Sequence, residues 1–178
     1  MISKFELAAS CLSAVAEVIR QMVTVKGRVR IQKTAYFLKR LGMAELKGVE
    51  FFYHHYGPFS RTVAESLLDG ERCGALQEEA RPFEDDRQAY AYRLTAQASK
   101  KVDDVSPESR ALVERLVARV KEEHWRTLEL ASTIDFLEQH DALERSKALS
   151  RALGLKPACE GYQQPAIRLL DDLRLPTA

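Results

Sequence analysis

The chain has 178 residues, of which 46% are hydrophobic and 30% charged, and its 27 basic and 26 acidic side chains give a formal net charge of +1. This balance argues against a strongly basic nucleic-acid coat and against an acidic disordered chain, and the length suits one hydrophobic core better than two. We expect a mainly α protein with a small antiparallel β-hairpin. The expected domains are a winged-helix-like core over residues 1–104, with the hairpin at about residues 75–94, and a helical extension over residues 105–178 packed on the same core.

Cysteine usage and hydropathy indicate the compartment. Cys11, Cys73 and Cys159 are far apart and include no Cys-x-x-Cys pair, so they frame neither a disulfide scaffold nor a zinc site. We interpret them as reduced thiols. The N-terminal segment lacks the apolar region of a signal peptide, and no uncharged apolar run approaches the ~20 residues that span a bilayer. We therefore expect a cytoplasmic protein without a membrane partner, a metal or a cofactor.

Two amphipathic helices are predicted first. Residues 5–22 repeat apolar positions at intervals of three and four, and a second helix begins near Arg28 and ends near Gly42. We expect the second helix to show a basic outer face with Arg28, Lys33, Lys39 and Arg40. Residues 1–65 carry 10 basic and 5 acidic side chains, so an anionic partner would meet this third of the chain. A solvated face and a binding face both fit the cluster.

An aromatic segment follows. Residues 49–56 are β-branched or aromatic at most positions, which predicts an extended segment that Gly57-Pro58 stops. Ser60 is then the expected N-cap of a helix with Val63 and Leu67 inward, frayed between Gly70 and Gly74. Two interpretations remain open for the aromatic side chains Tyr53, Tyr56 and Phe59. They pack the two flanking helices together, or they form a rigid aromatic ledge for a protein partner.

A β-hairpin is predicted next. Two strand-like runs, residues 75–83 and 88–94, flank the polar turn of residues 84–87. A helix followed by this hairpin is the order of a winged helix, in which the hairpin is the wing.

The pattern of the C-terminal part predicts four helical stretches. Ser106-Pro107-Glu108 is a helix start, a break is expected near residues 122–123, and Trp125 begins the next stretch. Shorter helices are expected over residues 143–153, ending at Gly154, and over residues 165–173. Residues 156–161 read as a loop.

Catalytic signatures are missing from the sequence. His54, His55, His124 and His140 form no metal-ligand spacing, and in an extended segment His54 and His55 point to opposite faces. No nucleophile elbow, phosphate-binding loop or dinucleotide fingerprint is present. We therefore expect no catalytic residues, and keep an unrecognised enzyme acting on nucleic acid or nucleotides as a second alternative. Its sign would be a cleft that joins His54 or His55 to Glu50 and a basic side chain, within hydrogen-bond reach.

Two motifs resemble a known family. Residues 30–38, Arg-Ile-Gln-Lys-Thr-Ala-Tyr-Phe-Leu, and residues 53–60, Tyr-His-His-Tyr-Gly-Pro-Phe-Ser, resemble the Panacea family of SocA-like antitoxins and related YwgA-type bacterial proteins. Residues 128–137 also resemble a later helix of the YwgA-type branch. The resemblance covers about residues 2–140. It implies a mostly helical domain without catalytic residues that neutralises a toxin by direct binding.

The leading hypothesis is thus a non-catalytic, antitoxin-like protein whose partner is a protein, a toxin encoded nearby. A homodimer is also left open. The first alternative is a winged-helix DNA-binding regulator in which the helix from Ser60 enters the major groove. The acidic residues of that helix and the acidic turn at residues 84–86 argue against DNA binding. The expected partner-binding residues are Arg28, Gln32, Lys33, Tyr36, Tyr53, Tyr56, Phe59 and Arg61.

Overall fold

The computed structural model describes residues 3–82 and 88–176 and is mainly helical, with small antiparallel sheets, as the sequence predicts. The α-helices are α1 (Lys4–Met22), α2 (Arg28–Arg40), α3 (Arg61–Arg72), α4 (Ala98–Lys101), α5 (Pro107–Val120), α6 (Trp125–His140), α7 (Arg145–Leu155) and α8 (Gln163–Leu173). Two 3-10 helices are η1 (Ala44–Leu46) and η3 (Pro157–Tyr162). The strands are β1 (Val25–Lys26), β2 (Phe52–His54), β3 (Gly57–Phe59), β4 (Leu76–Pro82) and β5 (Gln88–Leu94). None of the described helices is long and apolar enough to cross a membrane.

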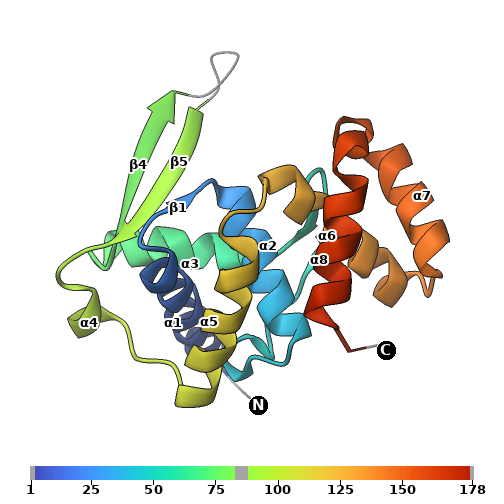
Figure 1. Cartoon of the computed structure of the whole chain (residues 1–178). Coiled ribbons are helices and arrows are strands. Elements are labelled where there is room, and N and C mark those ends of the chain that lie inside the picture. The colour runs from blue at the N-terminus through green and yellow to red at the C-terminus, as the bar shows by residue number, and fades with distance from the viewer. Residues whose placement is uncertain (1–2, 83–87, 177–178) are drawn as a thin grey trace.

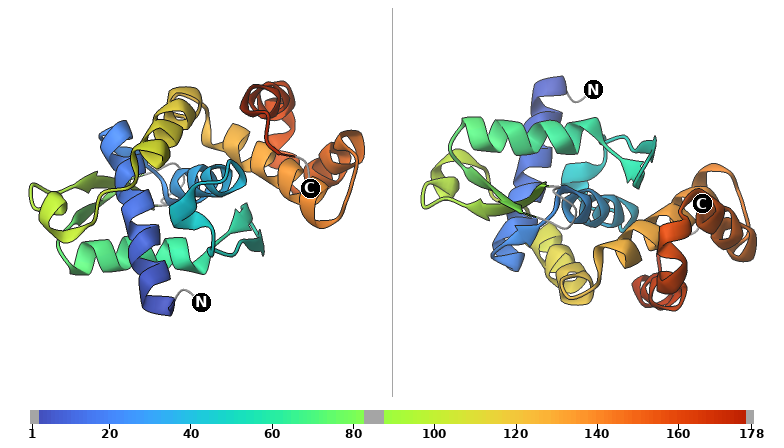
Figure 2. Two further views of the ribbon diagram at one scale, coloured as in Figure 1. Left: turned by 90° about the horizontal axis from the view of Figure 1, so that it is seen from below. Right: turned by 90° about the horizontal axis from the view of Figure 1, so that it is seen from above.

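Two separate antiparallel sheets form. The first has the order β1-β5-β4, and its β4–β5 hairpin projects from one end of the helical body (Figure 1). This hairpin lies where the sequence predicts it, although the predicted polar turn of residues 84–87 lies outside the described residues. The second sheet contains only β2 and β3, paired as Phe52↔Phe59, Tyr53↔Pro58 and His54↔Gly57. In both views of Figure 2 this teal hairpin stands out from the body beside α3.

One hydrophobic cluster runs through the whole molecule, from Cys11 in α1 to Leu170 in α8. The segment that joins its two ends is α6, whose residues 127–137 are all buried. A helix that is buried on every face lies inside a core rather than on its surface. Figure 2 shows α6 leading from the N-terminal elements toward α7 and α8 at the far end of the body.

Local capping explains where three helices begin. Ser3 and Glu6 form a capping box at α1, the Ser60 hydroxyl accepts a bond from the Val63 N–H at 3.4 Å, and Ser106 accepts one from Ser109 at 3.1 Å. These side chains satisfy backbone donors that a helix start leaves open. The predicted starts at Ser60 and Ser106 are therefore confirmed.

Helix α3 ends at Arg72, between Gly70 and Gly74 as predicted, and a Cβ at Gly70 would overlap the side chains of Leu76 and Leu12, so that glycine also permits close packing. Other predicted boundaries are wrong. Gly154 lies within α7, because a single glycine costs a helix only about 1 kcal/mol. The expected loop of residues 156–161 largely forms η3, and the extended segment of residues 49–56 is a strand only over β2.

Candidate functional site

The β2–β3 hairpin, residues 52–59, presents aromatic rings to solvent, and we call it the aromatic corner. Tyr56 is 49% exposed, Phe52 44% and Tyr53 38%. Phe59 is half-buried and lies edge-on to Phe52, with ring centroids 5.5 Å apart. The rings of His54 and His55 are 5.0 Å apart, because the strand ends at His54, so the expectation that they point to opposite faces is wrong.

Helix α2 holds the inner edge of this hairpin. The Gln32 amide accepts a bond from the Ser60 N–H and donates one to the Ser60 carbonyl, both at 2.9 Å. Lys33 Nζ donates to the Pro58 carbonyl at 2.7 Å. Both α2 side chains are buried, so they satisfy backbone groups that would otherwise lie unpaired in the core. In effect, α2 supplies the bonds that a third strand would make.

Helix α6 closes around the turn. Gly57 has a φ of +82°, and a Cβ there would overlap Thr133 Oγ1 and lie 3.5 Å from the Glu129 carbonyl oxygen. The Thr133 hydroxyl donates to that same carbonyl at 2.7 Å, which fixes it against the turn. Only glycine allows both this backbone conformation and this approach.

A buried ion pair completes the support. Glu129 of α6 meets Lys156 Nζ at 2.9 Å, and Lys156 also donates to the carbonyl of His55 at the tip of the corner. The Cys159 thiol lies 3.7 Å from the other Glu129 oxygen. Burial, followed by the charge of Glu129, raises the pKa of Cys159 to about 11, so the thiol stays protonated. These groups join α6 and η3 to the corner.

Burial lowers the pKa of Lys33 to about 7, with Glu129 opposing the shift and Lys156 adding to it. Between that pKa and the ordinary value of 10.5, the unfolded chain binds a proton at Lys33 that the folded chain has lost. The free energy of unfolding therefore gains a contribution that increases as the pH rises through this window.

The Lys33→Met variant tests this contribution. We expect its free energy of unfolding, measured by urea titration at pH 7, 8 and 9, to rise less steeply with pH than that of the natural protein. Lys47→Met, which alters an exposed lysine, is the control and should keep the natural slope. Equal slopes for the Lys33→Met variant and the natural protein would show that Lys33 titrates normally when folded.

A second polar link joins α2 to α6 below the corner. The Tyr36 hydroxyl donates to Asp135 Oδ2 at 2.5 Å, and Arg40 Nε pairs with the same oxygen at 2.8 Å. Burial, then Asp135, raises the pKa of Tyr36, so the phenol remains a donor. Beside this link lies an open hollow of about 280 Å³ between α2 and α6, called the α2–α6 hollow, which is lined by Tyr36, Lys39, Arg40, Phe51, Phe136, Gln139 and His140.

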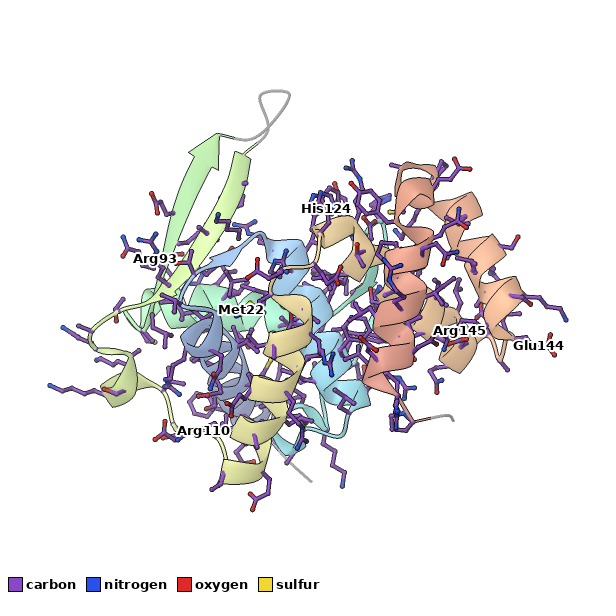
Figure 3. All side chains as sticks on the ribbon, in the orientation of Figure 1. Met22, Arg93, Arg110, His124, Glu144 and Arg145 are labelled. Atoms are coloured by element: carbon purple, nitrogen blue, oxygen red, sulfur yellow. The ribbon has the colours of Figure 1, made fainter. Side chains whose placement is uncertain are left out.

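A larger hollow of about 600 Å³ opens at the other end, between α6, α7 and α8. Glu144 and Arg145 lie there, at the start of α7 (Figure 3). Arg145 already pairs with Glu138 and, at 3.6 Å, with Asp171. The guanidinium of Arg145 is thus engaged within the chain. Neither hollow is lined by His54, His55 or Glu50, so neither contains the cleft expected for an enzyme.

The structure divides the eight predicted binding residues into three groups. Tyr53, Tyr56 and Phe59 belong to the corner, and Arg61 follows it, exposed, at the start of α3. Gln32, Lys33 and Tyr36 are buried and bind within the chain, so placing Lys33 on the outer face of α2 was wrong. Arg28 is remote from the corner and binds Tyr92 at 2.8 Å and Glu78 at 3.0 Å on the β4–β5 hairpin.

The supporting residues Glu129, Asp135 and Lys156 were not predicted. Glu129 and Asp135 are two carboxylates within a helical stretch that is otherwise mostly apolar or small, and such carboxylates are usually paired when buried. That pattern gives a signal for their burial, but nothing in the sequence names their partners.

Among the residues that the structure describes, no three His, Cys, Asp or Glu side chains are grouped so that they could hold a metal ion. Comparison with known proteins gives no match, either to a protein-family model or to a curated protein.

Proposed function

We propose that this chain is a non-catalytic protein-binding module and that the aromatic corner is its contact surface. The proposal rests on one observation: the aromatic rings of the corner are exposed, whereas the backbone beneath them is held in place. Phe52, Tyr53 and Tyr56 face solvent, while the backbone beneath them is bonded by Lys33 of α2 and by Lys156, which lies between α7 and η3. The turn also packs against Thr133 of α6. Aromatic rings on a rigid backbone lose little conformational entropy on binding and are common interface anchors.

The partner class comes from the resemblance to SocA-like antitoxins. The two motifs behind it, residues 30–38 and 53–60, are the segments that meet in space through Gln32, Lys33, Pro58 and Ser60. We therefore propose a toxin encoded beside this gene as the partner, neutralised by direct coverage of its surface. The test is co-expression with the neighbouring gene product: a stable complex on size-exclusion chromatography and restored growth are expected, whereas separate elution and continued growth arrest contradict the proposal.

DNA binding is the second candidate. With η1 and the β2–β3 hairpin between α2 and α3 set aside, the chain order α1-β1-α2-α3-β4-β5 and the sheet order β1-β5-β4 resemble those of a winged helix. The contacts at α3 favour the protein-binding module over DNA binding. Its N-cap, Ser60, is buried against Gln32, and its exposed side chains include Glu65 and Asp69 as well as Arg61. Acidic side chains repel phosphate. An electrophoretic shift at low salt would favour DNA binding, and its absence would remove that candidate.

A further inference from the structure

The two edges of the β2–β3 hairpin differ in how their backbone groups are bonded. On the β3 edge, Gln32 and Lys33 bind the Ser60 and Pro58 backbone. On the β2 edge, no other described strand pairs with Phe52–His54, and all three side chains are exposed. Natural proteins usually cover or blunt such an edge, because it is a template for another strand.

The register shows which groups point outward. In an antiparallel pair, hydrogen-bonded and non-hydrogen-bonded pairs alternate. Pro58 has no N–H, and its carbonyl points away from β2 to Lys33, so Tyr53↔Pro58 is the non-hydrogen-bonded pair. The N–H and carbonyl of Tyr53 therefore point to the outer edge of β2, where they could bond an added strand.

The α2–α6 hollow adjoins this edge. Phe51 directly precedes β2 and lines the hollow, and the Tyr53 ring lies 6.3 Å from that of Phe136, which also lines it. Tyr36 is a further lining residue, with its ring 5.3 Å from that of Phe51. The volume of the hollow, about 280 Å³, is just below the range of roughly 300–1,000 Å³ that is typical of small-molecule pockets. A hollow of this volume suits one side chain of a partner.

Two cationic side chains of α2, Lys39 and Arg40, line the hollow. Arg40 is paired with Asp135 at 2.8 Å, so Lys39, which donates to the carbonyl of Val49, is the cation left to meet a partner's carboxylate. Glu50 is exposed and acts on Lys39 through its charge. A partner segment that brings acidic side chains on either side of its apolar one therefore matches the rim.

We propose that the partner protein binds by adding an extended strand to the outer edge of β2, with one apolar side chain in the α2–α6 hollow and acidic side chains at its rim. Strand addition gives affinity through main-chain bonds and specificity through the pocket. This inference rests on the proposed function, since it assigns the chemistry of the same surface.

The probe is the peptide acetyl-Ser-Glu-Thr-Leu-Thr-Glu-Ser-amide, in which both Glu side chains share the face of Leu in an extended strand. It is titrated against the full chain and followed by amide NMR. We expect saturable binding with a Kd below about 1 mM, and slower hydrogen exchange at the Tyr53 amide. Two further versions of the peptide are N-methylated at alternate residues, so that each version has one blocked edge and one free edge. The version whose blocked edge faces β2 should lose binding. Replacing both Glu by Lys should weaken binding at least about fivefold. An absence of saturation, or equal binding by all versions, overturns the proposal.

Two variants test the edge itself. Tyr53→Ala removes the ring and keeps the N–H, whereas Tyr53→Pro also removes the outward N–H, at a position where an edge strand tolerates proline. We expect Tyr53→Pro to weaken binding at least about tenfold beyond Tyr53→Ala, since one main-chain bond is lost. Equal effects overturn strand addition.

The outcomes separate this inference from the proposed function. If the neighbouring gene product still forms a complex that Tyr53→Ala weakens but Tyr53→Pro does not weaken further, the corner is the contact surface and strand addition is wrong. A dimer of the free protein that Tyr53→Pro dissociates, detected by analytical ultracentrifugation, would assign the edge to a second copy of the chain and likewise overturn the inference.

Discussion

Replacing Glu129 by alanine is expected to lower the free energy of unfolding by about 3–5 kcal/mol, the largest effect of any single substitution considered. Glu129 is the carboxylate that pairs with the buried Lys156 ammonium at 2.9 Å, and its charge also acts on the buried Lys33. Without it, two lysine side chains remain in the core with no opposite charge between them. Urea unfolding at pH 7 measures the change.

Two controls identify the cause. Glu144→Ala breaks an exposed pair with Lys147, whose charged atoms are 3.8 Å apart, and should cost less than about 1 kcal/mol. The double variant Glu129→Leu with Lys156→Met replaces the buried pair by apolar groups and should recover much of the loss. If Glu129→Ala is as mild as Glu144→Ala, the buried pair does not stabilise the fold.

The second large effect is expected for Gly57→Ala, at about 3 kcal/mol of destabilisation. Strain from a positive φ contributes about 1–3 kcal/mol, and overpacking against Thr133 contributes a similar amount. Because the strain lies beside the turn of the aromatic corner, partner binding should weaken as well. Thermal unfolding followed by circular dichroism measures the loss of stability.

Gly154→Ala is the matched control, because Gly154 lies in α7 with open space where the Cβ would go. It should leave stability unchanged or raise it by up to about 1 kcal/mol. Adding Thr133→Ala to Gly57→Ala should relieve the overlap but leave the backbone strain. A Gly57→Ala protein as stable as Gly154→Ala would contradict the account of this turn.

Much of the fold follows from local signals. Apolar spacing and the caps Ser60 and Ser106 predict the major helices to within a few residues, because both depend on neighbours along the chain. Gly154 misleads, because glycine is typical of a helix end, whereas α7 continues through it to Leu155. The two-residue strand β1 is too short to leave a pattern.

The candidate site was only partly predictable. The aromatic run marks the corner in the sequence, and Tyr53 and Tyr56 lie exposed there. The prediction that Gly57-Pro58 stops the extended segment is wrong, because these residues begin β3 and pair with β2. The roles of Gln32 and Lys33 could not be read, because their partners are 28 and 25 residues away and are backbone carbonyls and an N–H rather than side chains. Lys156 is 101 residues from the carbonyl that it binds.

The most direct test of the central claim is calorimetric titration of the neighbouring gene product into the natural protein, the double variant Tyr53→Ala with Tyr56→Ala, and Phe5→Ala. Phe5 is an aromatic residue on α1 that is 85% exposed, so it controls for the loss of a surface ring. If the aromatic corner is the contact surface, the double variant should raise the Kd at least about 100-fold with its fold intact, and Phe5→Ala should leave the Kd unchanged. Equal Kd values for all three proteins would show that the partner binds elsewhere.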